Sequence, residues 1–415
     1  MSWVVRTPYL SSYHAGFGLW RFAGDSIGYH EEAIKILNLL KQGDYVGWWS
    51  VSQWWHVKLI AMSYWVFTPH PLSFAPVNAA VWAISIMLVH RIIKQLFPNR
   101  QKLAVVSGLT FGLCPSYLLN TTQLLKEPLY VVGVVIFVFG WVALLLGRRS
   151  VRLPLIVGLG VLLACINRLY ICGPLVLLSL LAMIPVIWRA RQASVYALLA
   201  FVLVVGIYVL SSEMRDKAGY RKVVNAARNA ELETKKESIY KLNSSNPAQA
   251  PLPHWLEDRL LTVLWARNAF ARSFPDAGSN IDTEVHLRTP IDLVRYIPRA
   301  FQIGFLAPFP DQWFKEGKSA GRISRLIAGL EMAGWYFLLP GFVYFLCTGA
   351  PALRIRFWLV VFSVSVVVLT AVLVTNIGAL MRMRFVYFLP IIIGGLEGWS
   401  RLIWRKKMGV STNGV

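Results

Sequence analysis

Residues 128–147 read PLYVVGVVIFVFGWVALLLG, a run of 20 residues without a charged side chain. An α-helix rises about 1.5 Å per residue, so a run of this length crosses the ~30 Å hydrocarbon core of a lipid bilayer. A backbone in lipid has to satisfy its own hydrogen bonds, and the alternating polarity of an outer-membrane barrel is missing from the chain. The stretch therefore predicts a membrane-spanning α-helix.

The rest of the chain repeats this pattern. Of its 415 residues, 56% are hydrophobic and 15% are charged, which excludes an ordinary soluble enzyme. We predict an all-α polytopic membrane protein with about nine transmembrane helices. Their expected positions are residues 76–97, 103–121, 128–147, 153–169, 171–188, 193–212, 325–347, 356–375 and 385–404.

The net charge of +22 comes from 42 Lys and Arg residues against 20 Asp and Glu. Such an excess fits a nucleic-acid binder, a membrane protein with basic cytoplasmic loops, or a binder of anionic lipid. The basic residues are spread over alternate connections and do not form one patch, which argues against nucleic acid. By the positive-inside rule the more basic connections are cytoplasmic, as is the C-terminus. These connections contain Arg91, Lys94, Arg100, Lys102, Arg148, Arg149, Arg152, Arg189, Arg191, Arg354, Arg356, Arg405, Lys406 and Lys407.

This orientation divides the chain into four parts. Residues 1–75 hold seven of the 17 Trp and are expected to form interfacial helices at the outer face. Residues 76–212 form transmembrane helices one to six. Residues 213–324 hold 13 of the 20 acidic residues and form an outer-face insert. Residues 325–415 form helices seven to nine and a basic cytoplasmic tail.

The insert has its own internal pattern. We expect a polar helix near 214–242, a linker at 243–253 and a second helix near 254–272. A Pro-rich stretch at 307–314 then returns the chain to the membrane surface.

An outer N-terminus normally needs a signal peptide or an initial span to carry it across the membrane. Residues 1–24 contain neither an apolar core nor a cleavage site. Either a first helix is lost or the short segment crosses without one, and we expect the former.

The four cysteines, Cys114, Cys165, Cys172 and Cys347, lie in or at the ends of expected spans. They lack the paired spacing of metal ligands, so neither a zinc site nor a disulfide framework is expected.

Asp25 is one of seven acidic residues outside the insert. It is suited to capping a helix that starts near Ser26. The alternatives are a general base that takes a proton from an acceptor hydroxyl, and a ligand for a divalent cation on a pyrophosphate.

Four cations stand at expected outer helix ends, where the positive-inside rule disfavours them. If these ends converge, they form a basic pocket for a lipid phosphate, because Arg binds phosphate oxygens with paired donors. The alternative is interfacial snorkelling without a ligand. The four residues are Lys126, Arg168, Arg382 and Arg384.

Three short motifs combine these residues, and together they resemble GT-C-type polytopic membrane glycosyltransferases. The likeness is to the bacterial members related to the dolichyl-phosphate-mannose and undecaprenyl-phosphate-sugar dependent transferases, and it covers residues 20–180 and 376–404 in layout. The motifs are Asp25, Tyr29, His30 and Ala33 in the first outer loop, Leu125 to Pro128, and the late run of Asn376, Gly378, Arg382 and Arg384.

The resemblance implies a GT-C-like fold, a polyprenyl-phosphate or polyprenyl-pyrophosphate sugar donor, and an active site at the outer membrane surface. It implies that Asp25 is the catalytic base and that Lys126, Arg382 and Arg384 lie near the donor phosphate. The charge pattern adds Arg168 to this set. The supporting residues are Tyr29, His30, Glu127, Asn167 and Asn376. The chain departs from the family in lacking a helix before Asp25 and a second acidic residue in a later loop, for which Glu127 is a substitute.

Other side chains have weaker signals. A divalent cation, Mg²⁺ or Mn²⁺, is left open, with Asp25 and His30 as its candidate ligands and His56 beside them. Asn280 and Asp282 in the insert suit either a local turn or binding of the acceptor. Glu331 and Glu397 lie inside expected spans, where an interhelical hydrogen bond is as good an explanation as a functional role.

The sequence thus predicts a multi-pass glycosyltransferase of the bacterial cytoplasmic (inner) membrane, active at the outer face in cell-envelope or surface-polysaccharide synthesis. Its expected partners are a polyprenyl-linked sugar donor, a glycan, lipid or protein acceptor, and membrane lipid, with no nucleic acid. The alternatives are a polysaccharide polymerase or ligase, a lipid-linked sugar flippase or other transporter, and a non-catalytic subunit of an envelope-glycan complex.

Overall fold

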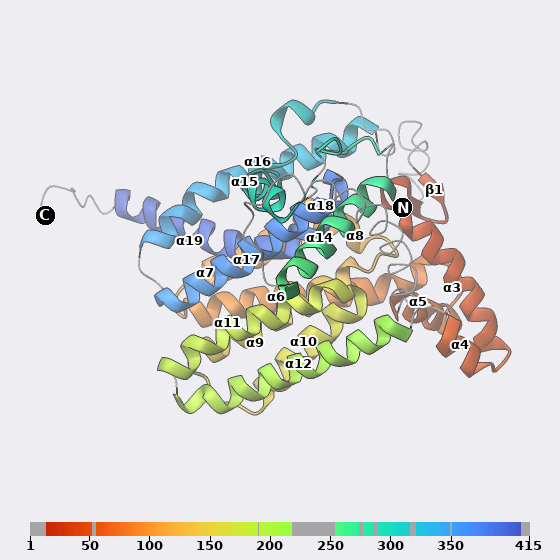
Figure 1. The fold of residues 1–415 in the computed structure, drawn as a ribbon, viewed down its shortest axis with the longest axis horizontal. Coiled ribbons are helices and arrows are strands. Elements are labelled where there is room, and N and C mark those ends of the chain that lie inside the picture. The colour runs from red at the N-terminus through yellow and green to blue at the C-terminus, as the bar shows by residue number, and fades with distance from the viewer. Residues whose placement is uncertain are drawn as a thin grey trace, which may run out of the picture.

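The computed structural model describes residues 14–51, 55–189, 191–217, 254–273, 277–285, 287, 289–315, 321–348 and 351–407. Apart from a two-stranded hairpin, β1 (His14–Gly16) and β2 (Leu19–Trp20), the regular structure of these residues is helical, as predicted. Long helices run side by side along the long axis of the molecule (Figure 1). The N-terminal helices lie at one end, and the last described helix, α19 (Leu389–Lys407), reaches the other.

Within the described residues, seven helices are long and apolar enough to cross a membrane, or eight if one bent pair counts as a single span. The chain is therefore a polytopic membrane protein, but nine spans are not confirmed. The seven are Pro71–Leu96, Glu127–Leu145, Leu169–Trp188, Ser194–Ser211, Gly321–Cys347, Leu353–Leu373 and Ile377–Ile403.

The count falls short of nine at two places. Predicted span 103–121 is broken into α7 (Gln101–Gly112) and α8 (Pro115–Thr121), which meet at 59°. The break falls at Pro115, which suits the first turn of a new helix and cannot continue an old one. Predicted span 153–169 becomes α10 (Arg152–Asn167), whose 16 residues rise only about 24 Å.

The remaining predicted spans appear as single helices with shifted ends. They are α6 (Ala75–Leu96), α9 (Glu127–Leu145), α11 (Cys172–Arg189), α12 (Ser194–Lys217), α16 (Gly321–Cys347), α17 (Leu353–Leu373) and α19 (Leu389–Lys407), which follows the short α18 (Ile377–Arg384). The core of the bundle packs around α9, whose side chains are buried almost throughout. Many large apolar side chains on α10, α11 and α12 are exposed, as expected for surfaces that face lipid.

The N-terminal part forms three helices at one end of the bundle, α3 (Asp25–Lys41), α4 (Tyr45–Val51) and α5 (Trp55–Val66). Trp49 and Trp65 are each 60% exposed, an unusual position for tryptophan in a water-facing surface. Their place at a membrane interface stays a prediction.

Only part of the predicted insert is described. The expected polar helix near 214–242 and the linker at 243–253 lie largely or wholly outside the described residues. The second expected helix is confirmed as α14 (His254–Ser273) and is followed by α15 (Pro290–Leu306). Short 3-10 helices complete the chain: η1 (Arg21–Ala23), η2 (Pro71–Phe74), η3 (Leu169–Ile171), η4 (Arg191–Ala193), η5 (Pro310–Gln312) and η6 (Phe385–Phe388).

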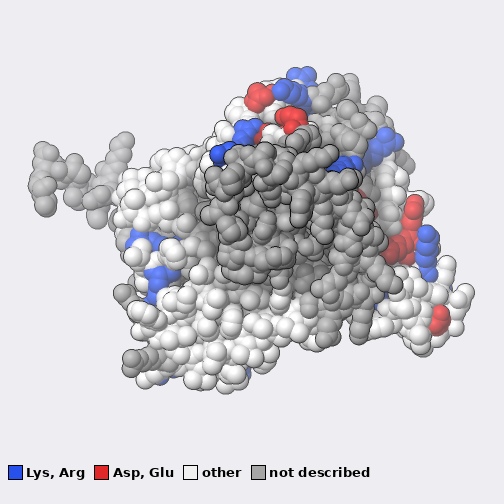
Figure 2. All heavy atoms as spheres, viewed as in Figure 1, with Lys and Arg blue, Asp and Glu red and all other residues white. Residues whose placement is uncertain are grey.

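The end of the bundle nearest the C-terminus gathers basic residues from several connections. Arg354 donates to the carbonyl of Leu145 at the end of α9, and Arg401 donates to that of Thr348 after α16. Arginine at these positions satisfies carbonyls that the helix leaves without a partner. On the face shown in Figure 2, this end carries Lys and Arg, and charges of both signs lie at the opposite end.

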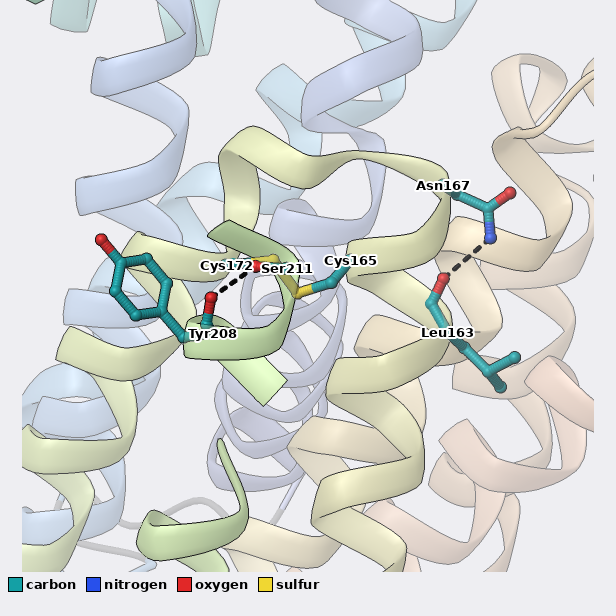
Figure 3. Close-up of a disulfide and its surroundings, with 6 residues drawn as sticks. All are labelled: Leu163, Cys165, Asn167, Cys172, Tyr208 and Ser211. Carbon is teal, nitrogen blue, oxygen red and sulfur yellow. Dashed lines mark hydrogen bonds between the residues drawn. A yellow bond between two sulfur atoms is a disulfide. The ribbon is translucent and has the colours of Figure 1, made fainter. Parts of the chain in front are cut away.

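Two cysteines form a disulfide that the sequence did not suggest. Cys165 in the last turn of α10 is joined to Cys172 in the first turn of α11, with Cα atoms 5.5 Å apart (Figure 3). The helical hairpin brings together two cysteines whose sequence spacing has no recognisable motif. The disulfide closes the loop that contains Arg168 and Tyr170. Cys114 and Cys347 are free.

Helices α16 and α19 approach backbone to backbone. A Cβ placed on Gly398 would stand 1.9 Å from the carbonyl oxygen of Gly341, and one on Gly341 would stand 2.4 Å from that of Gly395. Only glycine permits this contact, because the neighbouring atom belongs to the other helix backbone and cannot rotate away.

The disulfide predicts which cysteines react with an alkylating reagent. Under denaturing conditions without reductant, N-ethylmaleimide should label only Cys114 and Cys347, and after reduction it should label all four cysteines. Intact-mass measurement of protein purified from membranes distinguishes the two patterns. Labelling of all four before reduction would contradict the disulfide.

The contact between α16 and α19 predicts that Gly398→Ala destabilises the fold by about 1–3 kcal/mol, the usual cost of forcing extra atoms into a packed core. The matched control is Gly206→Ala in α12, where an added Cβ meets nothing within 4 Å. Thermal unfolding of both variants in the same detergent measures the difference, and equal melting temperatures would contradict the packing.

Candidate functional site

A cavity of about 360 Å³ opens at the end of the bundle next to α3. Seven of the side chains singled out in the sequence line it, and they come from parts of the chain as distant as α3 and α18. The fold thus places residues from separate sequence motifs in one cavity. The seven are Asp25, Tyr29, Lys126, Glu127, Arg168, Asn376 and Arg382, and Phe270, Ala379 and Met383 complete the lining.

Asp25 is the first residue of α3, and its carboxylate faces the cavity. The N-cap of α3 is Gly24 and has no side-chain cap bond, so the capping role considered for Asp25 does not apply. Its Oδ2 accepts a hydrogen bond from Arg382 Nη1 at 3.3 Å, and its side chain is 57% exposed. A carboxylate that is held by one arginine and open to solvent can still accept a proton.

Glu127 and Arg168 form a buried ion pair in the wall of the cavity. Their closest atoms, Oε1 and Nη2, are 2.8 Å apart, and both side chains are about 5% exposed. The guanidinium also stacks over Tyr130 at 5.0 Å and donates to the hydroxyl of Tyr170. Arg168 is therefore held in place by three contacts, and Glu127 balances its charge.

Lys126 precedes α9 and supplies a cation whose charge depends on pH. Burial lowers the pKa of its ammonium to about 8, and the charges of Arg168 and Arg382 act in the same direction. The carboxylates of Glu127 and Asp25 oppose this shift. An anion bound among these cations would favour the protonated lysine.

Two aromatic residues cover this group from the side of α3 and α5. Burial raises the pKa of Tyr29, and the charges of Asp25 and Glu127 add to the effect, so the phenol keeps its proton and can donate a hydrogen bond. The ring of Tyr29 contacts that of His56 edge to face, with centroids 4.3 Å apart. Burial lowers the pKa of His56 to about 3, aided by Lys126, so its imidazole is neutral.

Three other predicted residues of this site lie outside the cavity. Arg384 is buried and donates to the carbonyls of Ile303, Gly304 and Ala307, so its hydrogen-bonding groups hold the end of α15. Asn167 donates to Leu163 within α10 (Figure 3). His30 lies 2.8 Å from the Tyr64 hydroxyl, and burial lowers its pKa.

The two weaker candidates, Asn280 and Asp282, shape the site from the insert. Asn280 forms a β-bridge with Asn376, whose amide donates to the Asn280 side chain at 3.3 Å. Asn376 in turn caps α18 through Ala379. Asp282 accepts hydrogen bonds from Nε and Nη2 of Arg299, each at 2.9 Å, and from the Tyr296 hydroxyl, and the Arg299 bonds lower its pKa. A role for either residue in binding an acceptor stays a prediction.

A second cavity of about 320 Å³ lies next to the first at α18. The two cavities share Asn376, Ala379 and Arg382 in their linings. Of its lining residues, the sequence had indicated Glu331, Asn376, Gly378 and Arg382. The polar lining includes Ser116, Asn120, Ser279, Ser324, Arg325 and Glu331.

The donor set of the first cavity does not fit a divalent cation. Mg²⁺ and Mn²⁺ prefer several oxygen ligands, whereas here each of two carboxylates already contacts an arginine. Among the described residues, no three His, Cys, Asp or Glu side chains come together as metal ligands. The arrangement instead suits an anion held by Lys126, Arg168 and Arg382 beside the carboxylate of Asp25.

Comparisons with known proteins add no relative. No protein family, curated protein or solved structure matches the chain.

The position of Lys126 predicts pH-dependent anion binding. Farnesyl phosphate, a short polyprenyl phosphate, should bind about tenfold more weakly at pH 9.5 than at pH 7, because Lys126 loses its proton as the pH rises through about 8. In Lys126→Arg this dependence should disappear, since guanidinium stays charged. Titration calorimetry in detergent measures both. The same pH dependence in Lys126→Arg and the wild type would contradict the assignment.

Proposed function

We propose that this protein is a membrane glycosyltransferase that moves a sugar from a polyprenyl phosphate or pyrophosphate to an acceptor. The observation that carries the proposal is a cavity lined by the cations Lys126, Arg168 and Arg382 together with the solvent-accessible carboxylate of Asp25. Cations in a partly buried site stabilise a phosphate leaving group, and a nearby carboxylate can take the proton of an attacking hydroxyl.

Two features support a site at the outer face of a bacterial cytoplasmic membrane. The Cys165–Cys172 disulfide borders the loop that carries Arg168, and disulfides persist mainly in oxidising compartments such as the periplasm. The opposite end of the bundle carries arginines such as Arg354 and Arg401, in agreement with a cytoplasmic position under the positive-inside rule. We infer that the product enters a cell-envelope or surface polysaccharide.

The reaction we propose is a direct displacement. An acceptor hydroxyl gives its proton to Asp25 while its oxygen bonds to the anomeric carbon of the sugar. The bond between that carbon and the phosphate oxygen breaks, and the phosphate leaves with the electron pair. Lys126, Arg168 and Arg382 stabilise the added negative charge, and Arg382 also orients Asp25 through their 3.3 Å contact.

The proposal predicts different losses for the base and the phosphate-binding cation. Asp25→Asn should lower transfer by about 10²–10⁴-fold with little effect on farnesyl phosphate binding, because a general base acts in the chemical step. Arg382→Ala should weaken farnesyl phosphate binding about tenfold and also lower transfer. Transfer is measured as surface glycan in a strain without its own copy of the gene, and binding is measured on purified protein.

Matched controls are Asp311→Asn, whose exposed carboxylate pairs only with Lys315 among the described residues, and Arg295→Ala on the exposed side of α15. Both should retain wild-type glycan levels. Full glycan from both Asp25→Asn and Arg382→Ala would overturn the proposal. If Arg382→Ala loses glycan while Asp25→Asn keeps it, and a chelator leaves wild-type glycan synthesis unchanged, a polymerase or ligase is favoured instead. Accumulation of unflipped lipid-linked sugar in either variant would favour a transporter.

A further inference from the structure

We infer that the second cavity binds the sugar unit of a carbohydrate acceptor. This inference rests on the proposed transferase function. In that proposal the first cavity binds the phosphate of the sugar donor, and the inference assigns a site to the acceptor. The second cavity, of about 320 Å³, is near the lower end of the ~300–1,000 Å³ range of small-molecule sites. It therefore has room for a single sugar or the end of a short glycan.

The position of the cavity is the first argument. Arg382 lines both cavities, and its guanidinium contacts Asp25 at 3.3 Å. Phe22, three residues before Asp25, lines the second cavity from η1. The two cavities therefore meet at Arg382, and a hydroxyl of a ligand in the second cavity approaches the same arginine that holds the carboxylate of Asp25.

Asn120 is the second argument. It lines the cavity from α8, and only 6% of its surface is exposed. Within the described part of the chain its side-chain amide has no hydrogen-bond partner, although a buried amide offers two donors and an acceptor. Because this amide lines the cavity, its donors and acceptor are available to the hydroxyl groups of a ligand.

The mixture of lining groups selects a sugar over other ligands. Glu331 lines the cavity with a carboxylate fixed by the backbone N–H of Ser116 at 2.7 Å and by Trp335 at 3.2 Å. Carboxylate, amide and hydroxyl groups in one small cavity match the many hydroxyls of a carbohydrate, and Phe22 offers an aromatic face to the C–H side of the ring.

The charges of the second cavity are mixed. Two cations, Arg325 and Arg382, accompany the carboxylate of Glu331, and Arg325 already donates a hydrogen bond to the carbonyl of Gly278. The two cavities thus differ in chemistry: three cations line the first, whereas the second is lined mainly by apolar side chains with uncharged hydrogen-bonding groups among them. A neutral polyhydroxyl acceptor fits the second.

The experiment measures two probes on the full chain in lipid nanodiscs. The sugar probes are the methyl glycosides of glucose, galactose, mannose and N-acetylglucosamine, detected by saturation-transfer difference NMR, and the phosphate probe is farnesyl phosphate. At least one glycoside should bind to the wild type. Asn120→Ala should weaken that binding about tenfold, the effect of losing a buried hydrogen bond of about 1.4 kcal/mol.

A second variant, Ala277→Trp, fills the cavity without removing a polar group and should abolish glycoside binding. Both variants should bind farnesyl phosphate like the wild type, which also shows that they fold. The control Asn99→Ala, at an exposed asparagine that lines neither cavity, should leave both probes unaffected.

The outcomes separate this inference from the proposed function. Absence of glycoside binding in the wild type, or binding unchanged in both Asn120→Ala and Ala277→Trp, would overturn the acceptor site. Lys126→Ala should weaken binding of farnesyl phosphate and leave glycoside binding intact. If farnesyl phosphate fails to bind while glycoside binding depends on Asn120, the donor assignment falls and the second cavity stands as a sugar site.

Discussion

The ion pair between Glu127 and Arg168 is the contact on which the site depends. It joins the first residue of α9 to the loop between α10 and α11, at 2.8 Å and almost without exposure to solvent. Two desolvated charges gain little over apolar packing, but removing one partner leaves a buried charge at a cost of about 3–5 kcal/mol. Both side chains are therefore held in the pair, and the disulfide across the same loop restrains the loop covalently. Lys126 is placed by this contact, since it is the neighbour of Glu127.

Much of the helical fold can be predicted from hydropathy, because each lipid-crossing segment needs its own run of about 20 apolar residues. Residues 128–147 gave α9 almost to its ends. The count of spans is harder to predict, since it depends on where a helix breaks. Pro115 interrupts one apolar run, and α10 ends after 16 residues although its sequence is about as apolar as that of α11. The disulfide was missed because its cysteines meet only through the hairpin.

Part of the site can be predicted from the cations at unfavoured helix ends, but the direction of each side chain cannot. Arg382 and Arg384 lie two residues apart in α18, and side chains at that spacing point away from each other. One faces the cavity and the other enters a group of backbone carbonyls. Most of the lining of the second cavity could not be predicted from the sequence, because Phe22, Asn120 and Arg325 share no motif and come from separate elements.

The glycine contact between α16 and α19 has a consequence for the distance between the cavity walls. Gly341 lies ten residues, about 15 Å, along α16 from Glu331, and α19 follows directly from the segment that carries Arg382. At this contact the two helices meet through their backbones, and no side chain lies between them that could move to change their separation. The width of the gap between Glu331 and Arg382, and hence the size of molecule it accepts, is thus set partly in the middle of the bundle.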